Sequence, residues 1–170
     1  STGPCLVEVG SRCHGGEGTW LPIAQNAWRQ TMVGVTLDSY LDPDAFDKCE
    51  DRPLQVYQDG REVDLVSYFQ GTVESMPGVE EIRALPSFYK CELVVQPGSQ
   101  MVKTIDCFTR PGAVQLTHPD AEQVARDYRR IRELEREGLF KMVGGNEPIL
   151  PPPPPPGGKR KGPGGVKKKE

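Results

Sequence analysis

The spacing of apolar residues along this chain predicts short helices and strands in alternation. The clearest pattern runs from Pro119 to Glu137, where apolar residues recur at helical spacing and Gly138 follows. This stretch therefore predicts one amphipathic helix, with Thr117 or His118 as its N-terminal cap. The charged residues between the apolar ones are typical of a solvated helix face. The apolar face is Ala121, Val124, Ala125, Tyr128, Ile131 and Leu134.

Residues with high β-propensity dominate the middle of the chain. The stretch from Glu62 to Ser75 predicts one strand, with a bulge or a close approach at Gly71. Asp59 and Gly60 predict a turn before it. Further elements are predicted as a helix over 79–85, strands over 87–95 and 113–117, and an extended segment over 101–106. Residues 62–137 therefore predict an α+β unit, with an antiparallel sheet and helices on one side.

The first 50 residues predict a strand, a loop and helices. Leu6 to Val9 form a short apolar run that predicts a buried strand, and residues 10–19 form a glycine-containing loop. A helix is expected over 21–30. The pattern over 31–41 is compatible with a helix or a strand, and its length together with the following Asp42-Pro43 favours a helix. Pro43 suits the first turn of another short helix, with Asp42 as its cap.

The composition changes after Met142. Pro151 to Pro156 are six consecutive prolines, which predict a polyproline II rod, and residues 157–170 are rich in glycine and lysine. Such a composition cannot bury a core, so residues 143–170 predict a disordered tail. The tail is basic and the rest of the chain is acidic, so nucleic-acid binding by the folded part is not expected. The proline run is compatible with docking on an adaptor domain that has an aromatic-lined groove, and a tail without a partner is the alternative.

Other classes of protein are excluded by simple counts. No apolar run approaches the roughly 18 residues that span a bilayer, so no membrane segment is expected. The beginning lacks the features of a secretory signal, which together with the cysteines favours a cytoplasmic protein. Five cysteines without a C-x-x-C pair predict neither a disulfide framework nor a zinc site. Because the chain opens with Ser1 just before the first predicted strand, we expect a fragment of a longer protein.

The candidate chemistry lies at the start of the chain. Glu8 ends the first predicted strand and offers a hard oxygen ligand for Mg²⁺ or Mn²⁺. Arg12 follows four residues later and offers a planar fork for a phosphate or a carboxylate. Gly15 and Gly16 let the backbone approach a substrate closely. This order of residues predicts one edge of a site that handles a metal ion and phosphates.

Histidine and tryptophan residues add weaker candidates. His14 lies beside Arg12 and could contact a substrate or act as an acid–base group, although a loop histidine holding a backbone carbonyl is equally compatible. His118 is more compatible with a helix cap than with a catalyst. Trp20 and Trp28 are typical core residues, and Trp20, at the end of the loop, is the better candidate for a substrate wall.

At these residues the chain resembles the C-terminal part of ATP-grasp proteins, the carboxylate–amine/thiol ligase superfamily. The segment from Leu6 to Val9 with Arg12, Gly15 and Gly16 is similar to the terminal E-x-N-x-R segment of that family. The resemblance covers about residues 3–142. It extends over the stretches 65–73, 82–87 and 104–109.

The resemblance implies a fold, a reaction and a set of site residues. The fold would be the C-terminal part of an ATP-grasp fold, with residues 1–50 as the end of the core and 51–142 as a C-terminal subdomain. The reaction would use ATP and Mg²⁺ or Mn²⁺ to activate a small-molecule carboxylate as an acyl-phosphate, which an amine or thiol then attacks. Arg12 and His14 would be catalytic. Glu8 would be the metal ligand. The cofactor-binding residues would be Glu8, Arg12, Gly15 and Gly16.

One position departs from the family pattern. Gly10 stands where the pattern has Asn, so one side-chain oxygen is missing. The upstream elements that grip ATP in the family are also not in this chain, so the chain alone is not expected to be active. Two alternatives therefore remain. The chain could be a degenerate relative without catalysis, or a binding module that acts through its polyproline and basic tail.

Overall fold

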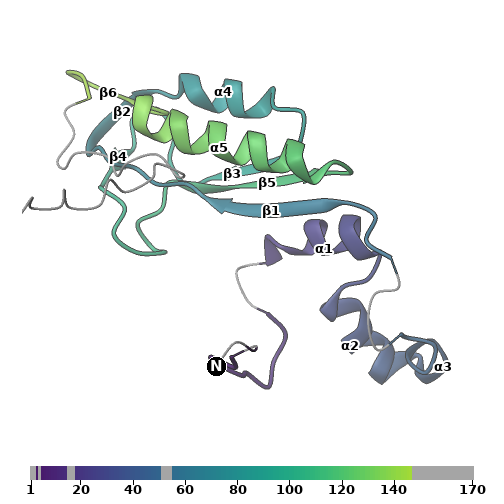
Figure 1. The fold of residues 1–170 in the computed structure, drawn as a ribbon. Coiled ribbons are helices and arrows are strands. Elements are labelled where there is room, and N and C mark those ends of the chain that lie inside the picture. Colours follow the sequence, from purple (N-terminus) through teal and green to yellow (C-terminus); the bar gives the residue numbers. More distant parts are fainter. Residues whose placement is uncertain (1–2, 4, 15–17, 51–54, 147–170) are drawn as a thin grey trace, which may run out of the picture.

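The protein is an α+β structure built on two antiparallel sheets of three strands each (Figure 1). The computed structural model describes residues 3, 5–14, 18–50 and 55–146. The first sheet has the strand order β1-β5-β3 and the second has the order β4-β2-β6. The strands are β1 (Asp59–Asp64), β2 (Gly71–Ser75), β3 (Phe88–Leu93), β4 (Gln100–Met101), β5 (Gly112–His118) and β6 (Lys141–Met142).

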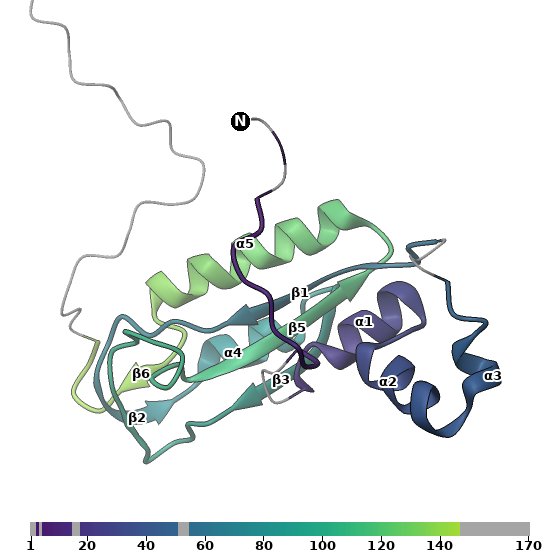
Figure 2. The same ribbon diagram turned by 90° about the horizontal axis from the view of Figure 1, so that it is seen from below.

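Helices cover both faces of the first sheet. They are α1 (Leu21–Trp28), α2 (Met32–Leu41), α3 (Pro43–Phe46), α4 (Pro77–Arg83) and α5 (Ala121–Glu137). Helices α4 and α5 lie together on one face, as predicted, and α1 lies on the opposite face of β1 and β5, with α2 and α3 beyond it (Figures 1 and 2). The predicted antiparallel α+β fold is confirmed, and α1 adds a layer that the pattern did not predict.

The alternation of side chains along β1 explains the two covered faces. Successive residues of a strand point to opposite sides. On one side, Arg61 stacks on the ring of Tyr128 from α5, 5.0 Å from its centroid. On the other side, Glu62 accepts a hydrogen bond from the Thr19 hydroxyl just before α1. Gly60 does not form the predicted turn but lies within β1, where a Cβ atom would come 2.5 Å from Ile23 of α1.

Helix α5 forms the main core contact and agrees with the predicted periodicity. Val124 and Ile131 are completely buried, and Leu134 is nearly so. The helix ends at Gly138, whose φ of 102° is a left-handed value that glycine adopts without strain. The predicted cap at Thr117 or His118 is wrong. Asp120, two or three residues later, caps the helix, and its side chain accepts the hydrogen bond from the backbone N–H of Glu122 at 2.9 Å.

The single strand predicted over Glu62 to Ser75 is wrong. Strands β1 and β2 lie in different sheets, and residues 65–70 cross between them. This crossover keeps an alternating burial pattern, but side chains satisfy part of its backbone. Glu135 accepts a hydrogen bond from the Val66 N–H at 2.9 Å, and Thr104 accepts one from the Ser67 N–H at 2.9 Å. Residues 65–70 therefore alternate between buried and less buried positions as a strand does, but their backbone hydrogen bonds are not those of a strand.

The strand predicted at Leu6 to Val9 is also wrong. These residues have no strand conformation, and the exposed fractions of Leu6, Val7 and Val9 are 80%, 93% and 82%. An apolar run forms a strand only when a neighbour takes up its backbone hydrogen bonds. Among the described residues no strand pairs with this segment.

Several predictions fall outside the described residues. Gly15 and Gly16 belong to this group, as do Pro151 to Pro156 and the rest of the tail from residue 147 onward. The adaptor partner of the proline run therefore stays a prediction. Within the described ranges, no helix has both the length and the apolar character needed to cross a membrane.

Glu135 on α5 is buried, although the sequence pattern assigned it to a solvated face. Its side chain is only 1% exposed, and one carboxylate oxygen accepts hydrogen bonds from Val66 and from Arg132 at 2.6 Å. The other oxygen, Oε2, is buried without a hydrogen-bond partner among the described residues. Burial raises the pKa of Glu135 above its ordinary value, against the lowering effect of Arg132.

This burial predicts a pH-dependent stability. Because the folded protein raises the pKa of Glu135, it favours the protonated carboxyl, and the free energy of unfolding should fall as pH rises from about 4.5 through the folded pKa. Glu135→Gln cannot ionise and should remove this decline. Urea unfolding between pH 4 and 7 measures it, with Glu133→Gln, an exposed neighbour, as the control. Parallel pH profiles for wild type and Glu135→Gln would contradict the assignment.

Candidate functional site

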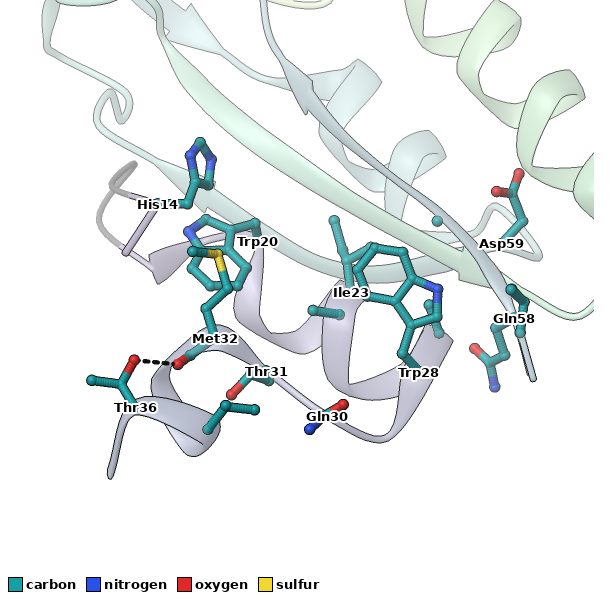
Figure 3. A pocket seen from close by; sticks show the side chains of 15 residues that line it. His14, Trp20, Ile23, Trp28, Gln30, Thr31, Met32, Thr36, Gln58 and Asp59 are labelled. Carbon is teal, nitrogen blue, oxygen red and sulfur yellow. Dashed lines mark hydrogen bonds between the residues drawn. The ribbon is translucent and has the colours of Figure 1, made fainter. Parts of the chain in front are cut away.

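A cavity of about 780 Å³ lies between α1, α2 and the beginning of β1 (Figure 3). Its walls are mainly apolar and include the two tryptophans of the chain. A small number of polar groups lie among them. The lining residues used below are His14, Trp20, Ile23, Ala24, Ala27, Trp28, Met32, Val35, Thr36 and Val56.

Local sequence features place the walls of the cavity. Thr31 caps α2 by accepting a hydrogen bond from the Gly34 N–H at 3.0 Å, which sets the turn between α1 and α2. The Tyr57 N–H donates to the Ala27 carbonyl at 2.8 Å and holds the chain before β1 against α1. Ala24 and Ala27 are buried, and their small side chains leave the space that the cavity occupies.

The segment around His14 lies at one end of the cavity. The His14 and Trp20 rings have centroids 5.3 Å apart with a tilt of 55°. The Cys13 sulfur lies 3.3 Å from the Thr36 hydroxyl of α2. His14, a residue of the predicted site, and its neighbour Cys13 therefore contact the cavity wall, His14 at Trp20 and Cys13 at α2. His14 is exposed at this edge, so a ligand can reach its ring.

Arg12 immediately precedes these two residues. Its side chain is exposed, and in the described part of the chain its guanidinium forms one hydrogen bond, from Nη1 to the Cys13 carbonyl at 3.2 Å. A guanidinium has five N–H donors, so most of them face solvent. The structure therefore presents an exposed cation two residues before His14, in the form that suits a carboxylate or a phosphate oxygen.

The structure does not bring Glu8 into this arrangement. Glu8 is exposed, and it lies on the segment that does not form the predicted strand. No cluster of three or more His, Cys, Asp or Glu side chains suited to a metal ion occurs in the described ranges. Since Mg²⁺ is held by several converging oxygens, Glu8 does not by itself make a magnesium site.

Gly10 has room for a side chain. A Cβ atom there would lie 3.8 Å from Cγ of Arg12, which is an ordinary contact. The backbone of Gly10 is not in the left-handed region. The structure therefore does not require glycine at position 10. Having Gly10 in place of the Asn of the family pattern removes a side-chain oxygen.

The cavity itself could not be predicted from the sequence. Trp20 was the better wall candidate, and the structure places both Trp20 and Trp28 in the wall (Figure 3). The α2 residues that complete it were missed. One signal was available: the apolar residues of 31–41 are spread around the helix, and none of them is buried.

Comparisons with known proteins identify the fold. Residues 65–134 match the model of a family described as L-amino acid ligase C-terminal domain 2. A solved structure, the crystal structure of L-amino acid ligase from Bacillus licheniformis, matches with a TM-score of 0.60 and 20% sequence identity. The match covers 81% of this chain and 32% of that ligase, so the chain spans about a third of its length. No curated protein matches significantly.

These findings define the fold of the chain, which is similar to a C-terminal portion of an L-amino acid ligase. The family match lies over β2, α4, β3, β4, β5 and most of α5. Residues 65–134 are therefore similar to the second C-terminal domain of L-amino acid ligases. The resemblance stated from the residues is confirmed for this portion.

Proposed function

We propose that this chain is the C-terminal part of an ATP-dependent carboxylate–amine ligase. In the proposed reaction, a carboxylate oxygen attacks the terminal phosphorus of ATP and forms an acyl-phosphate, and ADP leaves. An amine then attacks the acyl carbon, phosphate leaves, and the amine nitrogen loses a proton to give an amide. The substrates would be small molecules that carry a carboxylate and an amine.

One observation carries this proposal: His14 lines a cavity, two residues after Arg12, in a chain whose fold is similar to that of an L-amino acid ligase portion. Arg12 would bind a carboxylate or an acyl-phosphate oxygen through its fork of N–H donors. His14 would contact the substrate at the cavity edge. Both assignments rest on position and on the chemistry of the side chains.

The proposal also assigns the parts of the chain. Residues 1–50 would form the end of the ATP-grasp core, residues 51–142 the C-terminal subdomain, and residues 143–170 a tail. Contacts to ATP would come mainly from a region outside these 170 residues. Gly15 and Gly16 would let the backbone approach the substrate. A metal role for Glu8 would need further oxygen ligands from that same region.

The test is a ligation assay with the complete gene product. ATP and a set of amino acids are supplied with Mg²⁺ or Mn²⁺, and ADP, phosphate and amide are measured together. We expect one ADP and one phosphate for each amide formed, and hydroxylamine should divert the acyl-phosphate to a hydroxamate. ADP release that does not depend on any amino acid would overturn the proposal. Turnover that appears only in Gly10→Asn would favour the degenerate relative instead.

A further inference from the structure

We propose that the cavity between α1 and α2 holds the side chain of an amino-acid substrate and selects large apolar or aromatic side chains. This inference rests on the proposed function and names the substrate class of the same site. The residues that set the selectivity would be Ala24, Ala27, Trp28 and Met32, none of which carries a proposed role in the reaction itself.

The chemistry of the walls points to an apolar group. Ile23, Met32, Val35 and Val56 supply aliphatic surface. Trp20 and Trp28 supply aromatic faces from the two ends of α1 (Figure 3). Binding sites for small molecules are commonly 300–1,000 Å³, mainly apolar, with a few polar groups that fix orientation. A cavity of about 780 Å³ has room for a phenylalanine or tryptophan side chain together with part of the second substrate.

A polar side chain, His14, lies at one end of the cavity, beside Trp20. Cys13, the residue before it, contacts Thr36 of the cavity wall at 3.3 Å. A carboxylate bound near His14 would leave the side chain of the amino acid free to extend over Trp20 into the apolar space.

A second apolar surface on α2 is separate from the cavity. Its residues are Val33, Leu37, Tyr40 and Leu41, which are exposed by 38–82% and do not line the cavity. Met32, Val35 and Thr36 of α2 line the cavity instead.

The test compares substrates in the complete gene product. Ala27→Leu adds three carbon atoms to the cavity and should lower kcat/KM for L-phenylalanine at least 10-fold, while kcat/KM for L-alanine changes less than about 2-fold. Trp28→Ala should also lower kcat/KM for L-phenylalanine selectively. Gln25→Leu places the same leucine side chain on an exposed position of α1 outside the cavity and should leave both values unchanged.

A binding titration separates this inference from the proposed function. L-Phenylalanine should change the tryptophan fluorescence of the wild-type 170-residue chain, and it should do so less in Ala27→Leu. Fluorescence changes in a protein without amino-acid-dependent ATP turnover would support the cavity and overturn the ligase. If ligation occurs and Ala27→Leu lowers kcat/KM equally for phenylalanine and alanine, or for neither, the cavity assignment is overturned. The proposed ligase function is then still supported. A wild-type chain whose fluorescence does not respond to phenylalanine would also overturn the cavity assignment.

Discussion

Replacing Arg12 by alanine should reduce kcat/KM for the proposed ligation roughly 100- to 1,000-fold, because one charged donor to a developing negative charge is typically worth that factor. The guanidinium is exposed and donates one hydrogen bond to the Cys13 carbonyl, two residues before His14 of the cavity lining. Its remaining donors are available to a substrate oxygen. Steady-state kinetics with ATP and a good amino-acid pair measure the loss.

Two further variants make the Arg12 result specific. Arg12→Lys keeps the positive charge but loses the planar fork, so it should recover only part of the activity. Arg129→Ala removes an exposed arginine from α5 and should change kcat/KM by less than about 2-fold. If Arg12→Ala and Arg129→Ala behave alike, Arg12 has no part in the reaction.

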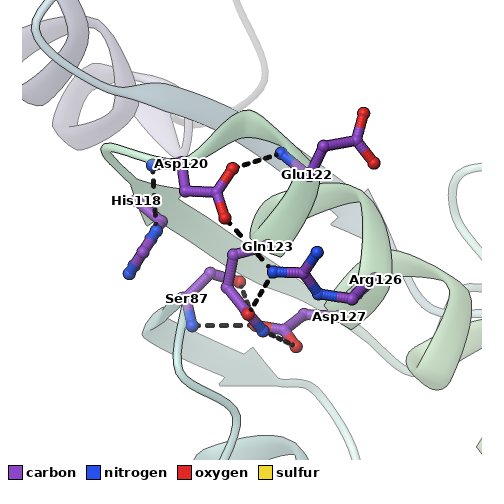
Figure 4. Close-up of polar contacts among 7 residues, drawn as sticks. All are labelled: Ser87, His118, Asp120, Glu122, Gln123, Arg126 and Asp127. Carbon is purple, nitrogen blue, oxygen red and sulfur yellow. Dashed lines mark hydrogen bonds and ion pairs between the residues drawn. The ribbon is translucent and has the colours of Figure 1, made fainter.

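The second large effect is expected at Asp127, a buried carboxylate of α5. One of its oxygens accepts hydrogen bonds from the Ser87 N–H at 2.8 Å and from the Ser87 hydroxyl at 2.6 Å (Figure 4). The other accepts one from Gln123 at 2.8 Å. Asp127 and Ser87 are 4% and 0% exposed, so water cannot replace the lost acceptor.

Asp127→Ala should therefore lower the free energy of unfolding by about 3–5 kcal/mol, because two donors of Ser87 would be left buried and unpaired. That is a large part of the 5–15 kcal/mol typical of a domain. Urea unfolding monitored by circular dichroism measures the change. Glu122→Ala, an exposed change in the first turn of the same helix, should cost less than about 1 kcal/mol. Equal losses in the two variants would show that Ser87 finds another partner.

Helix α5 and the helices near the start of the chain could be predicted because their signals are local. In α5, apolar residues recur at helical spacing and Gly138 ends the helix in a left-handed conformation. Asp42 caps α3 as expected, by accepting a hydrogen bond from the Ala45 N–H at 3.0 Å. Caps, glycine stops and helical periodicity depend on neighbours within a few residues, so the sequence contains the information.

The sheet arrangement could not be predicted in the same way. Residues 65–70 have the burial pattern of a strand, yet Glu135 and Thr104 take up backbone N–H groups there. These two partners lie 69 and 37 residues away in the chain. A strand is defined by hydrogen bonds to distant segments, so a pattern of buried residues is not sufficient to separate β1 from β2.

The sequence by itself determined the individual helices, the acidic body, the basic tail and the family resemblance that the comparisons confirm. The tertiary structure alone decided which residues meet: Glu135 is buried, Leu6 to Val9 are exposed, and His14 lies at a cavity formed with α1 and α2. The physical reason is the separation along the chain over which each effect acts. Periodicity and capping act within one or two turns, whereas burial and cavities depend on packing between segments that are far apart in the chain.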